Sequence, residues 1–147
     1  MDVRQLHRVL IVGLGSSGLA AARLAARDGA EVWVTDRRSA VDLEVEAAGL
    51  PDRCRTFFGG HSEACLEGVD LVVPSPGVAP GAEILQLARG REIAVIPEVE
   101  YAWLHAPTKP MAAITGSNGK STVTTLTAEI LRESGVAAVA GGNLGPA

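Results

Sequence analysis

Short aliphatic runs alternate with helix-forming segments along most of this chain. Residues 9–13 form a continuous aliphatic run, which is typical of a parallel strand buried on both faces. Further strands are predicted at residues 31–36, 55–58, 71–73 and 93–96. Helices are expected at residues 19–28, 41–48, 82–89 and 97–105, with a short helix that Ser62 opens. Repeated βα units imply an α/β fold with a doubly wound parallel sheet and right-handed crossovers.

The rhythm changes near Pro97, and two prolines follow within residues 106–110. A new βα unit then begins, with strands expected at residues 111–114 and 136–140 and a helix at residues 123–133. We therefore assign residues 1–97 to an N-terminal α/β domain and residues 98–147 to the start of a second α/β domain. Two strands bury too little sheet to stand alone, so we expect this chain to be a piece of a longer protein. One domain with a seven-stranded sheet is the alternative.

The first strand leads into a glycine-rich turn. Residues 13–18 read Gly-Leu-Gly-Ser-Ser-Gly, here called the glycine turn, and fit the G-x-G-x-x-G pattern of a Rossmann-like dinucleotide fold. Asp36 ends the second strand, where an acid would bind a ribose. Taken alone, these features predict NAD binding. Arg37 and Arg38 beside the acid instead favour a ligand with more negative charge, such as a nucleoside diphosphate.

A second glycine-rich loop occupies residues 115–122, Thr-Gly-Ser-Asn-Gly-Lys-Ser-Thr, and is here called the Lys120 loop. A strand, a glycine loop and a helix with Lys-Ser at the junction form the arrangement that holds nucleoside triphosphates. Its early glycine is Gly116, whereas the general pattern places glycine where Ile114 stands. An ordinary βα turn is therefore the alternative. The chain has only two lysines against eleven arginines, so a lysine here is unlike the background composition.

Composition excludes several classes of function. The net charge is −4 and no basic run could follow a phosphate backbone, so nucleic acid is not an expected partner. No apolar stretch approaches the ~20 residues of a membrane span. Cys54, His61 and Cys65 lack metal-binding spacing, so we expect idle or buried thiols in a reducing compartment. His7, His61 and His105 are each expected to be surface or capping residues.

Taken together, the motifs resemble those of the Mur ligases, the ATP-dependent amide-bond-forming enzymes of peptidoglycan precursor synthesis. The resemblance covers nearly the whole chain, and the shortened Lys120 loop matches the version of this family. It rests on the glycine turn, Asp36 with Arg37 and Arg38, residues 75–77 (Ser-Pro-Gly), the Lys120 loop and residues 141–145 (Gly-Gly-Asn-Leu-Gly). The branch that adds D-glutamate fits best, because Asn118 stands where the L-alanine-adding branch tends to carry His.

The resemblance implies a three-domain ligase whose N-terminal domain binds the UDP of its substrate and whose central domain binds ATP and Mg²⁺. The implied reaction activates UDP-N-acetylmuramoyl-L-alanine as an acyl phosphate, which the amine of D-glutamate then attacks. We expect a cytoplasmic monomer that acts on these small molecules in cell-wall synthesis, with neither nucleic acid nor membrane as a partner. The chain alone is expected to be inactive. A non-catalytic nucleotide sensor and an NAD-binding oxidoreductase are the alternatives.

In this scheme Lys120 is the catalytic residue that neutralises the β- and γ-phosphates, and Ser121 holds Mg²⁺. The remaining members of the ATP site are Gly116, Ser117, Asn118, Gly119 and Thr122.

The UDP side is expected to use residues from both domains: Ser16, Ser17, Asp36, Arg37, Arg38, Gly77 and Asn143. Each has a simpler alternative. The serines could only cap a helix, the arginines could be solvated surface charges, Gly77 could belong to an ordinary turn and Asn143 could be a left-handed turn residue.

Overall fold

The computed structural model describes residues 3, 5–106 and 110–142 of the chain. These fall into two compact units, Met1–Pro107 and Thr108–Ala147, here called unit 1 and unit 2. Within the described residues, no helix is long and apolar enough to cross a membrane.

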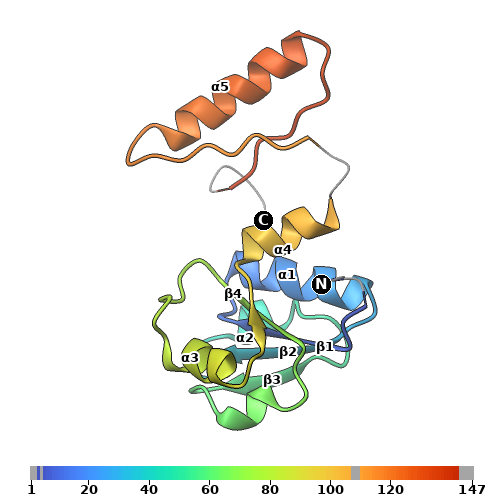
Figure 1. The fold of residues 1–147 in the computed structure, drawn as a ribbon, viewed down its shortest axis with the longest axis vertical. Coiled ribbons are helices and arrows are strands. Elements are labelled where there is room, and N and C mark those ends of the chain that lie inside the picture. Colours follow the sequence, from blue (N-terminus) through green and yellow to red (C-terminus); the bar gives the residue numbers. More distant parts are fainter. Residues whose placement is uncertain (1–2, 4, 107–109, 143–147) are drawn as a thin grey trace. The chain divides into compact units, whose positions relative to one another are not determined.

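Unit 1 is built on a parallel five-stranded sheet (Figure 1). Its strands are β1 (Arg8–Val12), β2 (Glu31–Asp36), β3 (Arg55–Phe58), β4 (Leu71–Pro74) and β5 (Ala94–Val95), in the order β3-β2-β1-β4-β5. Its helices are α1 (Ser16–Arg27), α2 (Glu44–Ala47), the 3₁₀ helix η1 (Glu63–Leu66), α3 (Glu83–Gly90) and α4 (Glu98–His105). The predicted α/β class and parallel sheet are confirmed, with helices following strands throughout.

The central strand β1 is buried on both faces, as its continuous aliphatic sequence predicts. Val9 and Ile11 point into one core, which α1 and α4 cover with Ala22, Ala25 and Tyr101. Alternate positions of β1 point into the other core, which η1 and α3 cover; its members include Leu10, Val12, Leu66, Ile84 and Leu85. Helices therefore pack on both faces of the sheet, and the fold is doubly wound.

Several predicted element boundaries follow from local chemistry. Gly29 ends α1 with a φ of +89°, and the Ala30 N–H donates to the Ala25 carbonyl across the end of the helix. Ser62 caps η1, since its hydroxyl accepts a hydrogen bond from the Ala64 N–H. These two signals could be read from the sequence.

Helix α4 groups with unit 1, although we placed the domain boundary at Pro97. The reason is Tyr101, which is 1% exposed in the core beside α1. His105 is nearly buried as well, where a surface or capping residue was expected: its Nε2 lies 2.5 Å from the Asp28 carboxylate, and its Nδ1 lies 2.7 Å from the Tyr101 carbonyl oxygen. Unit 1 therefore includes α4.

In unit 2, the described residues contain one helix, α5 (Lys120–Glu133). Gly135 terminates it, with a φ of +79° and a hydrogen bond from the Val136 N–H to the Leu131 carbonyl. The strands predicted at residues 111–114 and 136–140 were wrong for the described structure, which assigns neither segment to a strand. An aliphatic run becomes a strand only when a neighbour accepts and donates ladder hydrogen bonds, and neither segment has such a ladder here.

Candidate functional site

The glycine turn lies at the carboxyl end of the central strand, beside the end of β4. The Gly13 N–H donates to the Thr35 carbonyl over 2.8 Å, and the Ser75 N–H donates to the Val12 carbonyl over 2.9 Å. The strand order reverses direction between β1 and β4, which makes this edge the topological switch point of the sheet. Open α/β sheets bind their ligands at such a crevice, so the fold itself selects this edge.

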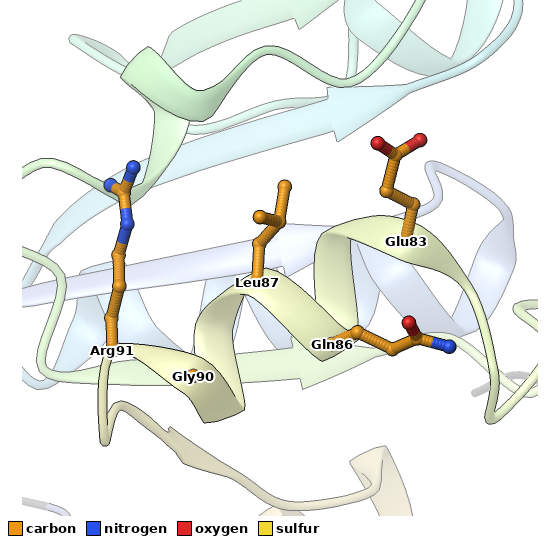
Figure 2. A pocket seen from close by; sticks show the side chains of 5 residues that line it. All are labelled: Glu83, Gln86, Leu87, Gly90 and Arg91. Atoms are coloured by element: carbon orange, nitrogen blue, oxygen red, sulfur yellow. The ribbon is translucent and has the colours of Figure 1, made fainter.

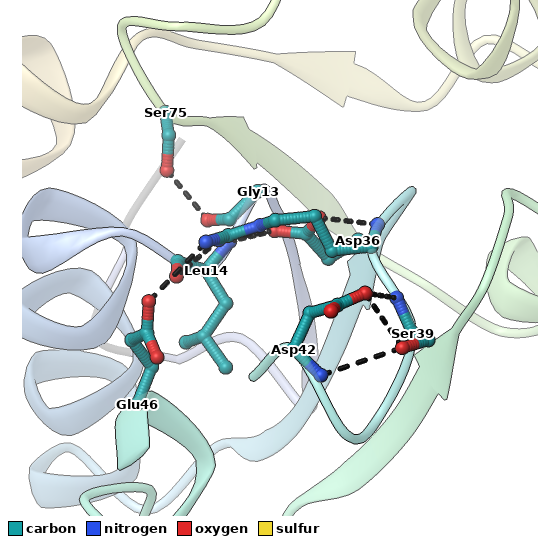
Figure 3. A network of polar contacts seen from close by, with 8 residues as sticks. Gly13, Leu14, Asp36, Ser39, Asp42, Glu46 and Ser75 are labelled. Carbon is teal, nitrogen blue, oxygen red and sulfur yellow. Dashed lines mark hydrogen bonds and ion pairs between the residues drawn. The ribbon is translucent and has the colours of Figure 1, made fainter. Parts of the chain in front are cut away.

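Two positions of the turn require glycine, one because of its backbone conformation and one because of close contacts. Gly13 has a φ of +89°, a conformation that side chains rarely allow. A Cβ on Gly18 would stand 2.1 Å from the Gly13 carbonyl oxygen and 2.7 Å from Ser75 Oγ. Ser75 Oγ itself donates to the Gly13 carbonyl over 2.6 Å, so the two turns are joined (Figure 3). By contrast, Gly15 faces open space.

The first turn of α1 presents uncapped donors. Gly15 is its N-cap residue and no side chain accepts a hydrogen bond there. Ser16 is exposed and Ser17 half-buried, and neither hydroxyl has a hydrogen bond to any described residue. The simpler alternative, in which these serines only cap the helix, is therefore absent from this structure. Free N–H groups and hydroxyls at a helix N-terminus are suited to an anion.

Asp36 sits at the centre of a polar network (Figure 3). It is 6% exposed, and its Oδ2 accepts the Leu14 N–H over 2.7 Å while its Oδ1 accepts the Arg38 N–H over 2.9 Å. Burial alone raises the pKa of this carboxyl, but hydrogen bonds from the Arg38 side chain and backbone and from Leu14 outweigh it and lower the pKa to about 2. Asp36 is thus ionised at neutral pH and ties the glycine turn to the end of β2.

Arg38 is held from three sides. Its Nε and Nη2 donate to the two carboxylate oxygens of Asp36 over 3.2 and 3.0 Å, and Nη2 also donates to the Leu14 carbonyl over 2.8 Å. Its Nη1 donates to Glu46 Oε1 over 3.2 Å. The alternative of a freely solvated surface charge does not describe Arg38. It does fit Arg37, which is exposed and has no hydrogen bond or ion pair with a described residue.

Gly77 lies in a turn that follows β4. The Val78 N–H donates to the Ser75 carbonyl over 2.9 Å and closes the turn. Gly77 is exposed, and a Cβ there would meet no atom within 4 Å. The geometry is that of an ordinary turn, and its backbone is accessible at the same sheet edge as the glycine turn.

The sequence did not predict that His61 lies at this edge. His61 Nδ1 lies 2.9 Å from Thr35 Oγ1, at the carboxyl ends of β2 and β3. Burial and the nearby Arg37 cation lower the pKa of His61, while Asp36 acts in the opposite direction. The available signal was the position of His61 after Gly59 and Gly60, where a strand end turns toward this edge.

The Lys120 loop belongs to unit 2. Gly119 adopts a φ of +77° immediately before α5, a left-handed conformation that favours glycine. Lys120 begins the helix, and its Nζ donates to the Gly116 carbonyl over 2.6 Å and to the Ser117 carbonyl over 3.4 Å. The backbone therefore curls around the ammonium group. No side chain caps α5, so its first N–H groups point out of the helix without a side-chain acceptor.

This loop fits a triphosphate with its cation. Ser121 is exposed on the first turn of α5, with its hydroxyl available to Mg²⁺. Asn118 and Thr122 are also exposed. In the described part of the chain no three His, Cys, Asp or Glu side chains gather as a metal site. Asn143 lies outside the described residues.

A shallow hollow elsewhere on unit 1 is lined by residues of α3 and the residue that follows it (Figure 2). Its lining residues are Glu83, Gln86, Leu87, Gly90 and Arg91. All of them come from one helix and the residue after it, and none belongs to the glycine turn or its polar network. Convergent polar groups are what marks a ligand site, and they occur at the switch point instead.

The chain is similar to known proteins over the region that contains this edge. Residues 7–97 match the family described as Mur ligase MurD-like, N-terminal domain. A UDP-N-acetylmuramoylalanine--D-glutamate ligase from Anaeromyxobacter dehalogenans is 49% identical over 138 residues, 94% of this chain and 30% of that protein. A protein of the same name from Geobacter metallireducens is 47% identical and covers 93% of this chain. The chain spans about 30% of the length of these curated relatives.

Among solved structures, a pseudomurein peptide ligase type C from Methanothermus fervidus aligns with a TM-score of 0.55 and 26% identity. The alignment covers 88% of this chain and 26% of that one. The family match spans the sheet, the glycine turn and the polar network around Asp36. On this evidence the chain belongs to the MurD-like Mur ligases.

Proposed function

We propose that the switch-point edge of unit 1 binds the UDP moiety of a UDP-linked sugar. The observation that carries the proposal is the union of an uncapped α1 N-terminus with the Arg38 guanidinium at one sheet edge. The N–H groups and hydroxyls of Ser16 and Ser17 serve the diphosphate, because each is a donor without a hydrogen-bond partner among the described residues. Arg38, with the exposed Arg37 beside it, supplies positive charge.

Asp36 acts on the ligand chiefly through its neighbours. Its two oxygens accept four hydrogen bonds, two from backbone N–H groups and two from the Arg38 guanidinium. A carboxylate has about four acceptor positions, so Asp36 orients the turn and the arginine. The exposed backbone of Gly77 completes the proposed set among the described residues, and Asn143, which lies outside them, is proposed on its sequence motif alone.

The Lys120 loop is proposed to bind ATP with Mg²⁺. Bound ATP supplies the phosphoryl group that activates a substrate carboxylate as an acyl phosphate. Lys120, whose ammonium bonds to the Gly116 carbonyl in this structure, would supply positive charge to the β- and γ-phosphates, and Ser121 would offer a hydroxyl to the cation. The N–H groups of residues 117–122 orient the phosphates, with Gly119 giving the backbone its close approach.

The activity proposed for the whole protein is addition of D-glutamate to UDP-N-acetylmuramoyl-L-alanine. Support comes from the relatives that carry this name and from Asn118 within the Lys120 loop. The proposal includes action as a monomer in the cytoplasm. The 147-residue chain alone is not expected to ligate, and D-glutamate-dependent release of ADP from the purified chain would refute that expectation.

Calorimetry with UDP and with NAD tests the first site. UDP is expected to bind, and Arg38→Ala is expected to weaken it by at least about tenfold, since charge-assisted hydrogen bonds contribute about 1.5–3 kcal/mol. Arg27→Ala is the matched control, because Arg27 is a mostly exposed arginine at the far end of α1. Tight NAD binding without UDP binding would favour an oxidoreductase and overturn the assignment.

Titration with ATP and Mg²⁺ tests the second site. Lys120→Ala is expected to weaken binding by at least about tenfold, because the β- and γ-phosphates lose their point charge. The other lysine of the sequence, Lys109, provides the control substitution Lys109→Ala. Equal effects of the two substitutions would remove Lys120 from the site.

A further inference from the structure

The Arg38 guanidinium uses nearly all of its donors inside unit 1. It has five N–H groups. Nε uses one on Asp36, Nη2 uses two on Asp36 and Leu14, and Nη1 uses one on Glu46. One N–H of Nη1 is left without a partner among the described residues.

Two different supports hold the guanidinium plane. Asp36, from β2, and Leu14, from the glycine turn, accept hydrogen bonds from Nε and Nη2. Glu46 grips the opposite nitrogen, Nη1, and comes from α2. Because the guanidinium is a rigid plane, both supports set its orientation, and Glu46 is the one that bonds to the nitrogen with an unpaired donor.

Glu46 is well placed for this task although α2 is short. The helix itself buries no residue, but the preceding Leu43 is fully buried in the core of unit 1. After the helix, Arg23 Nε donates to the Gly49 carbonyl over 3.0 Å. The segment is therefore anchored on both sides of Glu46, whose side chain is 33% exposed.

We propose that Glu46 is a positioning residue that fixes Arg38 with one guanidinium N–H directed at the UDP ligand. This inference rests on the proposed function of the switch-point edge. Glu46 does not itself bind the anion, since a carboxylate accepts hydrogen bonds and repels phosphate. It acts through Arg38, whose ion pair with Glu46 keeps the arginine from turning back toward solvent.

A double-mutant cycle on UDP binding tests the proposal in the 147-residue chain. Glu46→Ala is expected to weaken UDP binding about threefold to fivefold, the size of a partly exposed ion pair. Glu46→Gln keeps an acceptor oxygen and is expected to retain most of the affinity. In an Arg38→Ala background, Glu46→Ala is expected to change affinity less than about 1.5-fold, because the residue through which it acts is gone.

Glu44→Ala is the matched control, because Glu44 is an exposed acid on the same helix with no contact to Arg38. Thermal unfolding of each variant separates a folding defect from a binding defect. If UDP binds and Glu46→Ala behaves like Glu44→Ala, the inference is overturned while the proposed function stands. An undiminished effect in the Arg38→Ala background also overturns it. If UDP does not bind to the unaltered chain, the proposed function fails and the inference fails with it.

Discussion

The glycine turn of unit 1 and the Lys120 loop of unit 2 are held in shape by different means. The glycine turn is fixed by groups from distant parts of the chain: Ser75 bonds to Gly13, and Asp36 bonds to Leu14. The Lys120 loop is fixed by its own residues, since Lys120 bonds to Gly116 and Ser117 within a few positions. One site depends on the sheet and the other on local backbone geometry.

This difference shows in burial as well. The strands beside the glycine turn are almost fully buried, and Asp36 is buried with them. On α5, only Ala128 is buried, while Val123, Leu126 and Ile130 are 48–65% exposed. Substitutions of the buried groups at the first site should therefore alter the stability of unit 1, whereas substitutions in the loop should alter binding alone.

The largest effect is expected from Gly18→Ala. The added Cβ would collide with the Gly13 carbonyl at 2.1 Å, and backbone must move to relieve the contact. We expect a loss of about 3 kcal/mol in the free energy of unfolding, measured by urea denaturation. Gly15→Ala, which meets no atom within 4 Å, should cost less than about 1 kcal/mol. Equal losses would show that close packing does not hold the turn.

Asp36→Asn comes next and is pH-dependent. The folded chain lowers the pKa of Asp36 from 3.8 to about 2, so folding favours the ionised form. Its contribution, about 2 kcal/mol, is fully present above pH 3.8 and is lost as the pH falls toward 2. Urea denaturation at about pH 7 and about pH 3 should show the gap between wild type and variant narrowing on acidification. If the difference in unfolding free energy between wild type and variant does not depend on pH, the ionised Asp36 carboxylate does not stabilise the fold through these hydrogen bonds.

Ser75→Ala should have a smaller effect on unit 1. It removes the hydrogen bond to the Gly13 carbonyl and should cost about 1 kcal/mol in the free energy of unfolding. Ser16→Ala is the control, because the exposed Ser16 hydroxyl bonds to no described residue and its loss should leave stability unchanged. If both variants are equally stable in urea, the hydrogen bond from Ser75 to the Gly13 carbonyl contributes nothing to the stability of unit 1.

Lys120→Ala should have the smallest effect on folding. Its bonds lie within the loop, so the free energy of unfolding of unit 1 should change by less than about 0.5 kcal/mol. The fluorescence of Trp33 and Trp103, both in unit 1, reports this unfolding. A loss as large as that of Ser75→Ala would contradict the local construction of the loop.

Sequence alone predicts unit 1 well, because four of its five strands carry aliphatic residues, β3 carries a Thr-Phe-Phe run, and several helix ends carry their own glycine or serine signals. It predicts unit 2 less well. Residues 111–114 and 136–140 have strand composition, but a strand also needs a pairing edge, and composition says nothing about that edge. Both segments thus have the residue composition of a strand, but no neighbouring strand pairs with them in the described structure.

At the candidate site, sequence identifies residues but not how they are joined. Asp36 and Arg38 were expected because they lie at the end of a strand. The sequence did not predict that Glu46, 8 positions from Arg38, or Ser75, 62 positions from Gly13, would bond to this region. The acid was expected to meet a ligand directly, whereas the structure occupies both of its oxygens with the glycine turn and Arg38. The Ser75–Gly13 contact follows from the strand order, which places β4 beside β1 and which no local motif encodes.

The most direct test of the account is amide NMR of the isotope-labelled chain during titration with UDP and then with ATP and Mg²⁺. UDP is expected to shift the signals of Leu14, Ser16, Ser17 and Gly77, and ATP is expected to shift those of residues 116–122. The two sets should not overlap, and each ligand should leave the other set in place. Shifts by both ligands in one shared set, or no shift of the glycine turn with UDP, would contradict the account.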